Sequence, residues 1–325
     1  MQSNYIPNID LSDIIDKNLN SDAAIRVSKN IKKASEEIGF FTVTNHGIPI
    51  SKIDNLLETC KKFFYLNEEE KLKIAPKKWN PNTNTVYRGY FPSSVNGKEG
   101  LDIGDPLLNQ NMVDLLKKEK FEVNHDMSFL DPDWQITINN YFDDLHNLGI
   151  TIFKSIISSF SSDLSLAEKA FQRPKTLSTL RFNYYPEQEK PVEVSSQDGV
   201  ALGCETHVDS GIMTILYQDK KGGLQVQNRH SLEWYDVPHD PNAFVINTGL
   251  ALECLTNGKM KATNHRVLFN QEERISIPFF FEPSFDFILD PKYLDIYENI
   301  NYSIDNYENF LTNSLKKFVE YNRPA

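Results

Sequence analysis

The stretch HVDSGIMTILYQDKKGGLQVQ, residues 207–227, decides how the rest of this sequence is interpreted. It holds an apolar run from Ile212 to Tyr217, a Gly222-Gly223 pair and a second short run from Leu224 to Gln227. Short apolar runs that are separated by glycines are typical of β-strands joined by a turn. We therefore predict two neighbouring strands here, with the polar residues 207–209 leading into the first.

The triplet His207-Val208-Asp209 has the spacing of a metal site. Alternate residues of a strand face the same side, so His207 and Asp209 are expected to face one ion while Val208 packs behind them. A further histidine, His265, lies far along the chain and must come from a distant strand. Two imidazoles and one carboxylate form the facial triad that commonly holds non-haem Fe(II).

An arginine and a serine follow the last of these residues. Arg274 and Ser276 lie two positions apart in the segment RISIPFFF, so a strand would place both on one face. A guanidinium group binds a carboxylate through two parallel hydrogen bonds, which lysine cannot reproduce. The pair is therefore predicted to bind the far carboxylate of a dicarboxylic co-substrate, and the whole set suggests a protein that activates O2.

The triplet alone is weak support for a metal site, because histidine and aspartate are common near turns. The distal His265 and the Arg274–Ser276 pair together strengthen the prediction of a metal site far more than one of these features would alone. No catalytic residue is predicted beyond the metal ligands. The remaining histidines are not expected to bind the metal; they are His46, His125, His146, His230 and His239.

The order of the predicted elements indicates the fold class. Short β runs alternate with turn residues from residue 178 to residue 283, which is the rhythm of a jelly-roll barrel. Apolar residues at helical spacing predict helices over residues 24–38, 51–66, 134–160 and 306–321. Residues 76–110 are rich in Pro, Asn and Gly and are expected to form loops. The fold is therefore predicted to be mainly β with flanking helices.

Composition excludes several classes of protein. The chain has 325 residues and a net charge of −11, whereas a nucleic-acid partner usually needs a basic face. The odd number and wide spacing of Cys60, Cys204 and Cys254 predict reduced thiols rather than a disulfide framework. Neither a signal peptide nor an apolar run of ~18 residues is visible, so a cytoplasmic protein with no membrane span is expected.

Several further motifs resemble one family and occur in its order. Gly39–Ile48 reads GFFTVTNHGI, Leu180–Pro186 reads LRFNYYP, and Gly222–Val226 reads GGLQV. Asn247-Thr248-Gly249 and Asn264–Val267 complete the set together with the triplet. Almost end to end, the chain resembles the isopenicillin N synthase-like branch of the Fe(II)/2-oxoglutarate-dependent dioxygenases.

The resemblance implies a fold, a domain organisation and a reaction. The fold would be a double-stranded β-helix, cupin-like, with an N-terminal mixed α/β region over residues 1–125 packing on a core over residues 126–325. Fe(II), 2-oxoglutarate and O2 would serve to hydroxylate, desaturate or cyclise a small molecule, with succinate and CO2 as products. Tyr185 would assist Arg274 in binding 2-oxoglutarate, and Asn183 would support the iron site.

Besides Leu250, which stands where many members carry aspartate, the chain departs from the family pattern in two further places. Polar residues 189–199 make the segment before the metal triplet longer than is typical, and Cys204-Glu205 stand where small residues are common. These positions are expected near the substrate rather than the metal. Arg88, in the segment VYRGY, resembles an arginine that meets a substrate carboxylate in the isopenicillin N synthase-like proteins, although a solvated arginine beside a turn is an equally good interpretation.

Three alternatives remain open at this point. An oxidase of the isopenicillin N synthase or aminocyclopropane carboxylate oxidase kind would keep Arg274 and Ser276 without using 2-oxoglutarate. An ethylene-forming enzyme would fragment 2-oxoglutarate itself. A non-catalytic binding protein on the same fold is disfavoured by the intact triad.

Overall fold

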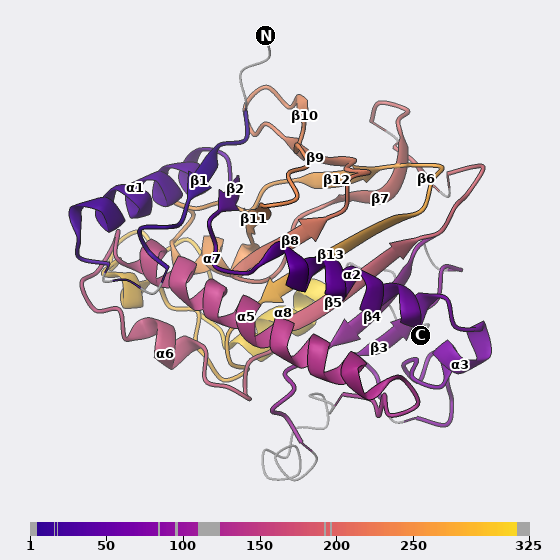
Figure 1. Ribbon diagram of the computed structural model, residues 1–325. Helices are drawn as coiled ribbons and strands as arrows, with labels where there is room; N and C mark the ends of the chain where they lie inside the picture. The colour runs from indigo at the N-terminus through magenta and orange to yellow at the C-terminus, as the bar shows by residue number, and fades with distance from the viewer. Residues whose placement is uncertain are drawn as a thin grey trace.

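The computed structural model describes residues 5–15, 17, 19–83, 85–94, 97–109, 124–191, 193–195 and 197–316. Two β-sheets face one another, and helices cover the outer face of the larger sheet (Figure 1). The predicted arrangement, mainly β with flanking helices, is confirmed by this architecture.

The larger sheet has eight strands among the described residues. In spatial order they are β1 (Asn8–Asp10), β2 (Phe40–Thr44), β11 (Phe244–Thr248), β8 (Met213–Gln218), β13 (Arg274–Phe281), β5 (Thr179–Tyr185), β4 (Glu99–Ile103) and β3 (Gly89–Phe91). The smaller sheet has five, which are β10 (Trp234–Asp236), β9 (Leu224–Gln227), β12 (His265–Leu268), β7 (Ala201–His207) and β6 (Glu193–Val194). The predicted N-terminal region thus supplies β1 to β4 to the same sheet as the later strands.

The two faces of the larger sheet have different surroundings. Ile275, Ile277 and Phe279 of β13 belong to the main apolar core, which lies between this sheet and the helices. A second, smaller core lies between the sheets and includes Tyr185 and Leu216. Because side chains of a strand alternate between faces, the polar residues of β13 point into the space between the sheets.

The four predicted helices occur close to where apolar periodicity predicts them, and the described residues also form three short α-helices and a 3-10 helix that were not predicted. Their observed bounds are α1 (Asp22–Glu37), α2 (Ile50–Phe64), α3 (Glu68–Leu72), α5 (Pro132–Ile157), α6 (Leu166–Ala170), α7 (Leu250–Leu255), the 3-10 helix η1 (Pro291–Leu294) and α8 (Tyr307–Leu315). The side chain of Ser21 caps α1, and Gly39 follows it at φ +77°, a conformation that glycine adopts readily. The predicted last helix continues to residue 321, and its part from residue 317 onward lies outside the described residues.

The prediction that residues 76–110 form only loops is wrong. The structure places β3 and β4 there, and Glu99–Ile103 pairs along its whole length with β5. Both strands are short and rich in glycine or charge, so they have no apolar alternation of their own. Pairing with β5 determines their conformation, and this non-local effect is invisible in a single sequence.

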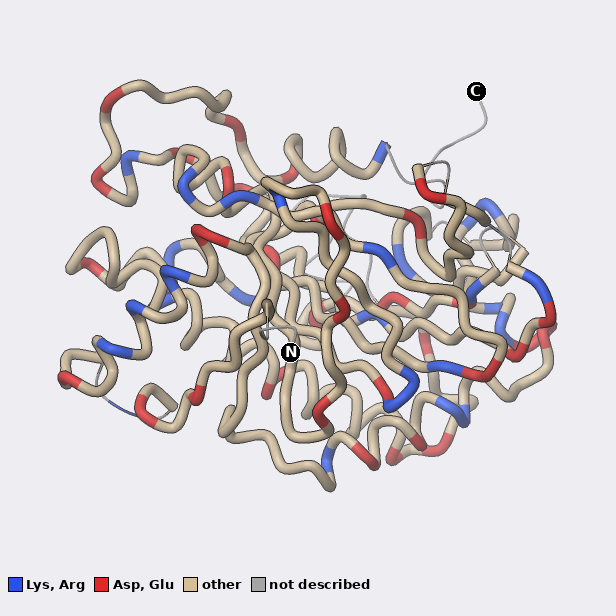
Figure 2. Tube along the Cα trace, turned by 90° about the horizontal axis from the view of Figure 1, so that it is seen from above, with Lys and Arg blue, Asp and Glu red and all other residues tan. Residues whose placement is uncertain are grey.

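Charged residues of both signs occur throughout the chain. Acidic and basic residues are interspersed along the trace rather than separated by sign (Figure 2). Among the helices that the structure describes, none combines the length and the apolar character needed to cross a membrane.

Candidate active site

Three side chains from two neighbouring strands and the following loop converge between the sheets. His207 is the last residue of β7, and His265, the first residue of β12, is its partner in the antiparallel pairing. Asp209 lies just beyond the end of β7, where its carbonyl accepts a hydrogen bond from Leu250 N at 2.9 Å. The predicted strand therefore ends at His207, two residues earlier than its alternation suggested, but both side chains still face the same point.

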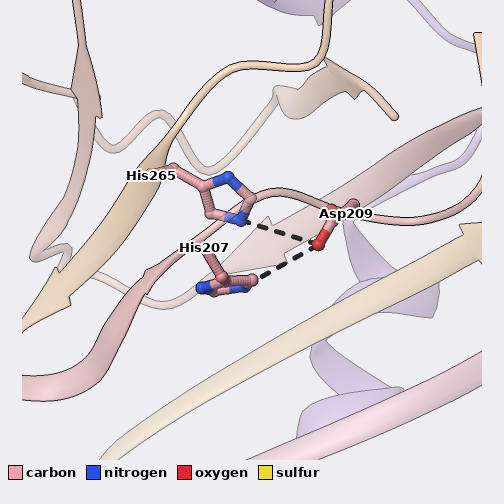
Figure 3. A group of neighbouring side chains, drawn as sticks. All are labelled: His207, Asp209 and His265. Atoms are coloured by element: carbon pink, nitrogen blue, oxygen red, sulfur yellow. Dashed lines mark ion pairs between the residues drawn. The ribbon is translucent and has the colours of Figure 1, made fainter. Parts of the chain in front are cut away.

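The ligand atoms are close enough to share one ion. Nε2 of His207 and Nε2 of His265 each lie 3.7 Å from Oδ1 of Asp209 (Figure 3). Atoms offered by the three residues all lie within 4.8 Å of one another, and no other such group of His, Cys, Asp and Glu occurs among the described residues. The structure therefore brings together the three residues that the sequence predicted as metal ligands.

Hydrogen bonds behind the triad leave one face of each ligand open. Nδ1 of His207 lies 2.8 Å from the carbonyl of Glu205, and Nδ1 of His265 lies 3.2 Å from that of Thr263. A proton on each Nδ1 leaves Nε2 free to bind a metal. The same contact that orients each ring thus selects the tautomer that a metal requires.

The carboxylate of Asp209 is held in a similar way. Oδ2 accepts hydrogen bonds from Asn247 Nδ2 at 2.8 Å and from Thr214 Oγ1 at 2.5 Å, which leaves Oδ1 directed at the histidines. Asn247 and Thr214 come from β11 and β8 and were not among the predicted site residues. Asn247 lies in one of the motifs that resemble the family. The sequence therefore marked this residue but did not show that it orients Asp209.

The protonation states of His207 and Asp209 also favour metal binding. Burial and the neighbouring His265 lower the pKa of His207 to about 4, so its ring is neutral at neutral pH. Burial alone would raise the pKa of Asp209, but the two histidines and the bonds from Thr214 and Asn247 lower it overall. A neutral imidazole and an ionised carboxylate are the forms that bind a metal ion, so the donor set fits Fe(II).

The residues predicted for the co-substrate lie together on the inward faces of two paired strands. Arg274 pairs with Tyr185, and Ser276 pairs with Asn183, across β13 and β5. Asn183 Nδ2 lies 3.5 Å from Ser276 Oγ, and the Arg274 guanidinium carbon lies 4.8 Å from the centre of the Tyr185 ring. Arg274 and Ser276 therefore share one face as predicted, and Tyr185 and Asn183 lie opposite them on the paired strand.

Arg274 has an unused hydrogen-bond donor in a buried position. Its side chain is 1% exposed, Nε donates to the carbonyl of Gly222 at 2.6 Å, and NH1 has no hydrogen-bond partner. Asn183 Oδ1 and Gln218 Oε1, which are acceptors on the neighbouring strands, are likewise buried without partners. A buried cation with an unsatisfied donor is costly to maintain unless an anion completes it, so Arg274 fits the carboxylate of 2-oxoglutarate.

A cavity of about 110 Å³ adjoins the triad. His207 and Asp209 line it, together with further polar and apolar side chains. Its polar lining includes Lys98, Asp102, Arg181, Cys204, Glu205 and Glu282, and its apolar lining includes Leu202, Phe280, Leu311 and Leu315. Burial raises the pKa of Glu282 to about 8, while Tyr307 and Arg88 oppose this rise.

Arg88, the residue predicted for the substrate, does not line this cavity. It is 3% exposed, and its NH2 donates to the carbonyls of Leu177 and Ser178 at 3.2 and 3.3 Å. The geometry therefore gives no support to a direct contact between Arg88 and a substrate. Arg181 is the arginine on the cavity wall, where Asp102 holds it through two hydrogen bonds of 2.5 and 2.6 Å.

The two departures from the family pattern lie in different places. Cys204 and Glu205 line the cavity as expected, and Lys98 Nζ lies 3.1 Å from Cys204 Sγ. The described part of the longer segment does not reach the cavity, and its Asp198 pairs with Arg266 at 2.7 Å. The extra length therefore contributes to the outer edge of the smaller sheet.

Comparison with known proteins agrees with this site. A family model described as the 2OG-Fe(II) oxygenase superfamily matches residues 176–283, and one described as non-haem dioxygenase in morphine synthesis N-terminal matches residues 6–136. A probable iron/ascorbate oxidoreductase of Dictyostelium discoideum is 32% identical over 294 residues, covering 80% of this chain and 76% of that protein. A 1-aminocyclopropane-1-carboxylate oxidase of the same organism is 28% identical and covers 96% and 90%.

The fold has close structural counterparts. A full-length protein of Neurospora crassa, solved in complex with alpha-KG and 5-formyluracil, superposes with a TM-score of 0.79 at 24% identity over 95% of both chains. The predicted double-stranded β-helix with flanking helices is thereby confirmed. The chain belongs to the 2OG-Fe(II) oxygenase superfamily. It is a non-haem iron dioxygenase of this superfamily.

Proposed function

We propose that His207, Asp209 and His265 bind the catalytic Fe(II), and that Arg274 binds the far carboxylate of 2-oxoglutarate. The observation that carries this proposal is the shared interior: the triad and the unpartnered NH1 of Arg274 both face the space between the sheets. Ser276, Tyr185 and Asn183 support the same carboxylate or its neighbourhood, with Ser276 as a hydroxyl donor.

The protein positions the reactants and excludes water. With both groups bound, Fe(II) and 2-oxoglutarate supply an oxidative decarboxylation that yields succinate and CO2 and oxidises a C–H bond of the substrate. His207, Asp209 and His265 would hold Fe(II), and the bound iron would supply the binding of 2-oxoglutarate and O2. The ligand contacts to Glu205, Thr263, Thr214 and Asn247 fix the triad before the co-substrate arrives, which lowers the cost of assembling the site.

We propose that the substrate is a small molecule that enters the cavity beside the triad. The lining mixes charged and apolar side chains, so the substrate would present both kinds of surface. If it carries a carboxylate, Arg181 and Lys98 are the cations on the wall that would face it. Hydroxylation, desaturation and ring closure all begin with loss of a hydrogen from such a substrate.

An oxidase that does not use 2-oxoglutarate is the second candidate. The likeness to a 1-aminocyclopropane-1-carboxylate oxidase over 96% of this chain favours it. The buried, unsatisfied NH1 of Arg274 beside Tyr185 favours the use of 2-oxoglutarate, because an anion is needed there.

The test is turnover of 2-oxoglutarate. The protein is loaded anaerobically with Fe(II) and 2-oxoglutarate and then exposed to air with a library of amino acids and other small metabolites. We expect succinate to form, and its rate to rise with a compound that becomes oxidised. Oxidation of a compound with no consumption of 2-oxoglutarate would instead establish the second candidate.

We also propose that the protein works in a reducing compartment such as the cytoplasm. Cys60 and Cys254 are buried thiols, Cys204 is half-buried, and none of the three forms a disulfide. Unpaired thiols are usual where glutathione keeps cysteine reduced.

A further inference from the structure

The inward face of β13 continues one residue past the end of the strand to Glu282. Arg274, Ser276, Phe280 and Glu282 occupy alternate positions, so they follow one another along the same face. At a rise of about 3.4 Å per residue, Ser276 and Glu282 are separated by about 20 Å along the chain. The interior therefore has a cationic end at Arg274 and an acidic end at Glu282, with the triad between the sheets nearby.

Glu282 is a buried carboxyl group that faces a cavity. Its residue is 5% exposed, it lines the cavity beside the triad, and Oε2 has no hydrogen-bond partner. Its backbone is fixed by Ser178, whose Oγ donates to the Glu282 carbonyl at 3.0 Å and accepts from its N–H at 3.1 Å. The hydrogen bonds with Ser178 therefore fix the backbone from which the Glu282 side chain extends.

Other buried carboxyl groups in this protein are satisfied internally. Glu99, for example, accepts hydrogen bonds of 2.6 Å from both Lys71 and Tyr90. Among the carboxyl groups that the structure describes, Glu282 is the one with a buried oxygen that meets no donor in good hydrogen-bond geometry, and Tyr307 is the internal donor that acts on it. Because such an oxygen costs free energy in the folded state, a ligand that supplies a donor would recover it.

The surroundings of Glu282 define the shape of that ligand. Tyr307 lies next to this carboxyl and acts on it as a hydrogen-bond donor, and Arg88, whose Nε is buried without a partner, is close enough to influence it electrostatically. Tyr307, Leu311 and Leu315 lie four residues apart on α8, and the two leucines line the cavity together with Phe280. The Glu282 carboxyl and these apolar side chains therefore line the same cavity.

We propose that Glu282 is a specificity-determining residue that accepts a hydrogen bond from an N–H or O–H group at one end of the primary substrate. The apolar body of the substrate lies along Phe280, Leu311 and Leu315, and the carbon to be oxidised faces the triad. The substrate class is therefore a largely apolar small molecule with a terminal amine, amide or hydroxyl group. This inference rests on the proposed function, because it places the substrate in the cavity beside the iron.

Calorimetry with three ring compounds of similar size tests the proposal. Toluene, benzyl alcohol and benzylamine are titrated into the anaerobic protein loaded with Fe(II) and 2-oxoglutarate. Binding of the loaded protein to at least one donor-bearing compound should be about tenfold tighter than its binding to toluene, which corresponds to ~1.4 kcal/mol. Benzyl alcohol presents a neutral donor and benzylamine a cationic one, so their order identifies the donor.

Variants at Glu282 assign the preference to this side chain. In Glu282→Met, close in length, and in Glu282→Leu, the tenfold preference should disappear while toluene binds as before. Glu282→Gln should lose a preference for benzylamine but keep one for benzyl alcohol, since the amide still has an acceptor. Glu298→Leu, a change of an exposed glutamate, is the matched control and should keep the wild-type order.

Three outcomes would overturn the proposal: equal affinities in the wild type, no binding of any compound, or a preference that survives in both apolar variants. Titration of 2-oxoglutarate alone into the same iron-loaded samples separates this failure from that of the proposed function. If 2-oxoglutarate binds and the ring compounds show no preference, only the role of Glu282 is lost.

Discussion

The two faces of β13 differ in chemistry and in surroundings. On one face, Ile275, Ile277, Phe279 and Phe281 are buried in the main core against the helices. On the other, Arg274, Ser276 and Glu282 face the space between the sheets and include unsatisfied polar atoms. A single strand thus places stabilising contacts and chemically active groups only one residue apart, so adjacent substitutions should separate stability from function.

The largest expected effect is on the apolar face. Phe279 is fully buried, and its ring meets that of Phe142 edge to face at 5.0 Å. Phe279→Ala should lower the free energy of unfolding by about 3–5 kcal/mol, because it removes buried apolar surface and leaves a cavity. Urea denaturation measures this change.

The adjacent Phe280→Ala is the matched control. Phe280 is only partly buried and lines the substrate cavity, so its loss should cost clearly less stability. Equal losses for the two variants would show that the faces do not differ as described.

The pH dependence of stability should also follow the apolar face. His146 packs on Phe281 in the main core, and burial together with Arg173 lowers its pKa to about 4. Because the folded pKa lies below the unfolded value of about 6.5, stability is complete above that value and falls as the pH drops toward 4. The loss should approach ~3 kcal/mol, at 1.36 kcal/mol per unit of pKa.

Unfolding at pH 7 and pH 4.5 in the wild type and in His146→Leu isolates this contribution. Other groups titrate over the same range, so the difference between the two proteins is the relevant quantity. If both lose the same stability on acidification, His146 does not titrate as proposed.

On the polar face, Arg274→Ala should affect binding more than folding. A hydrogen bond to a charged group contributes about 1.5–3 kcal/mol, so the apparent constant for 2-oxoglutarate should rise by ~10- to 150-fold. Ser276→Ala should raise it less, because its hydroxyl is a neutral donor. A constant that stays unchanged in Arg274→Ala would favour the oxidase that does not use 2-oxoglutarate.

A smaller effect, on iron affinity, is expected from residues that support the metal ligands through hydrogen bonds. Asn247→Ala removes a hydrogen bond of 2.8 Å that orients Asp209, and loss of such a supporting contact typically weakens metal binding by about 10- to 100-fold. Anaerobic Fe(II) titration measures it, with the exposed Asn242→Ala as control. Equal iron affinity in both variants would mean that Asn247 does not position the carboxylate.

Local alternation was enough to predict that His207 and Asp209 face one point and that Arg274 and Ser276 share one face. Both depend on a period of two residues that a strand imposes wherever it occurs. By contrast, β3 and β4 owe their conformation to pairing with β5, and the burial of Arg88 depends on carbonyls about ninety residues away. Glu282 was not predicted, because the cavity that it lines is formed by residues from distant parts of the chain.

The central claim is that the interior between the sheets binds Fe(II) through the triad and 2-oxoglutarate through Arg274. The most direct measurement is calorimetric titration of 2-oxoglutarate into anaerobic protein with and without Fe(II), for the wild type, His265→Ala and the exposed-histidine control His230→Ala. We predict binding that depends on iron in the wild type and in His230→Ala, and loss of that dependence in His265→Ala. Iron-dependent binding in His265→Ala that matches the wild type would contradict the account.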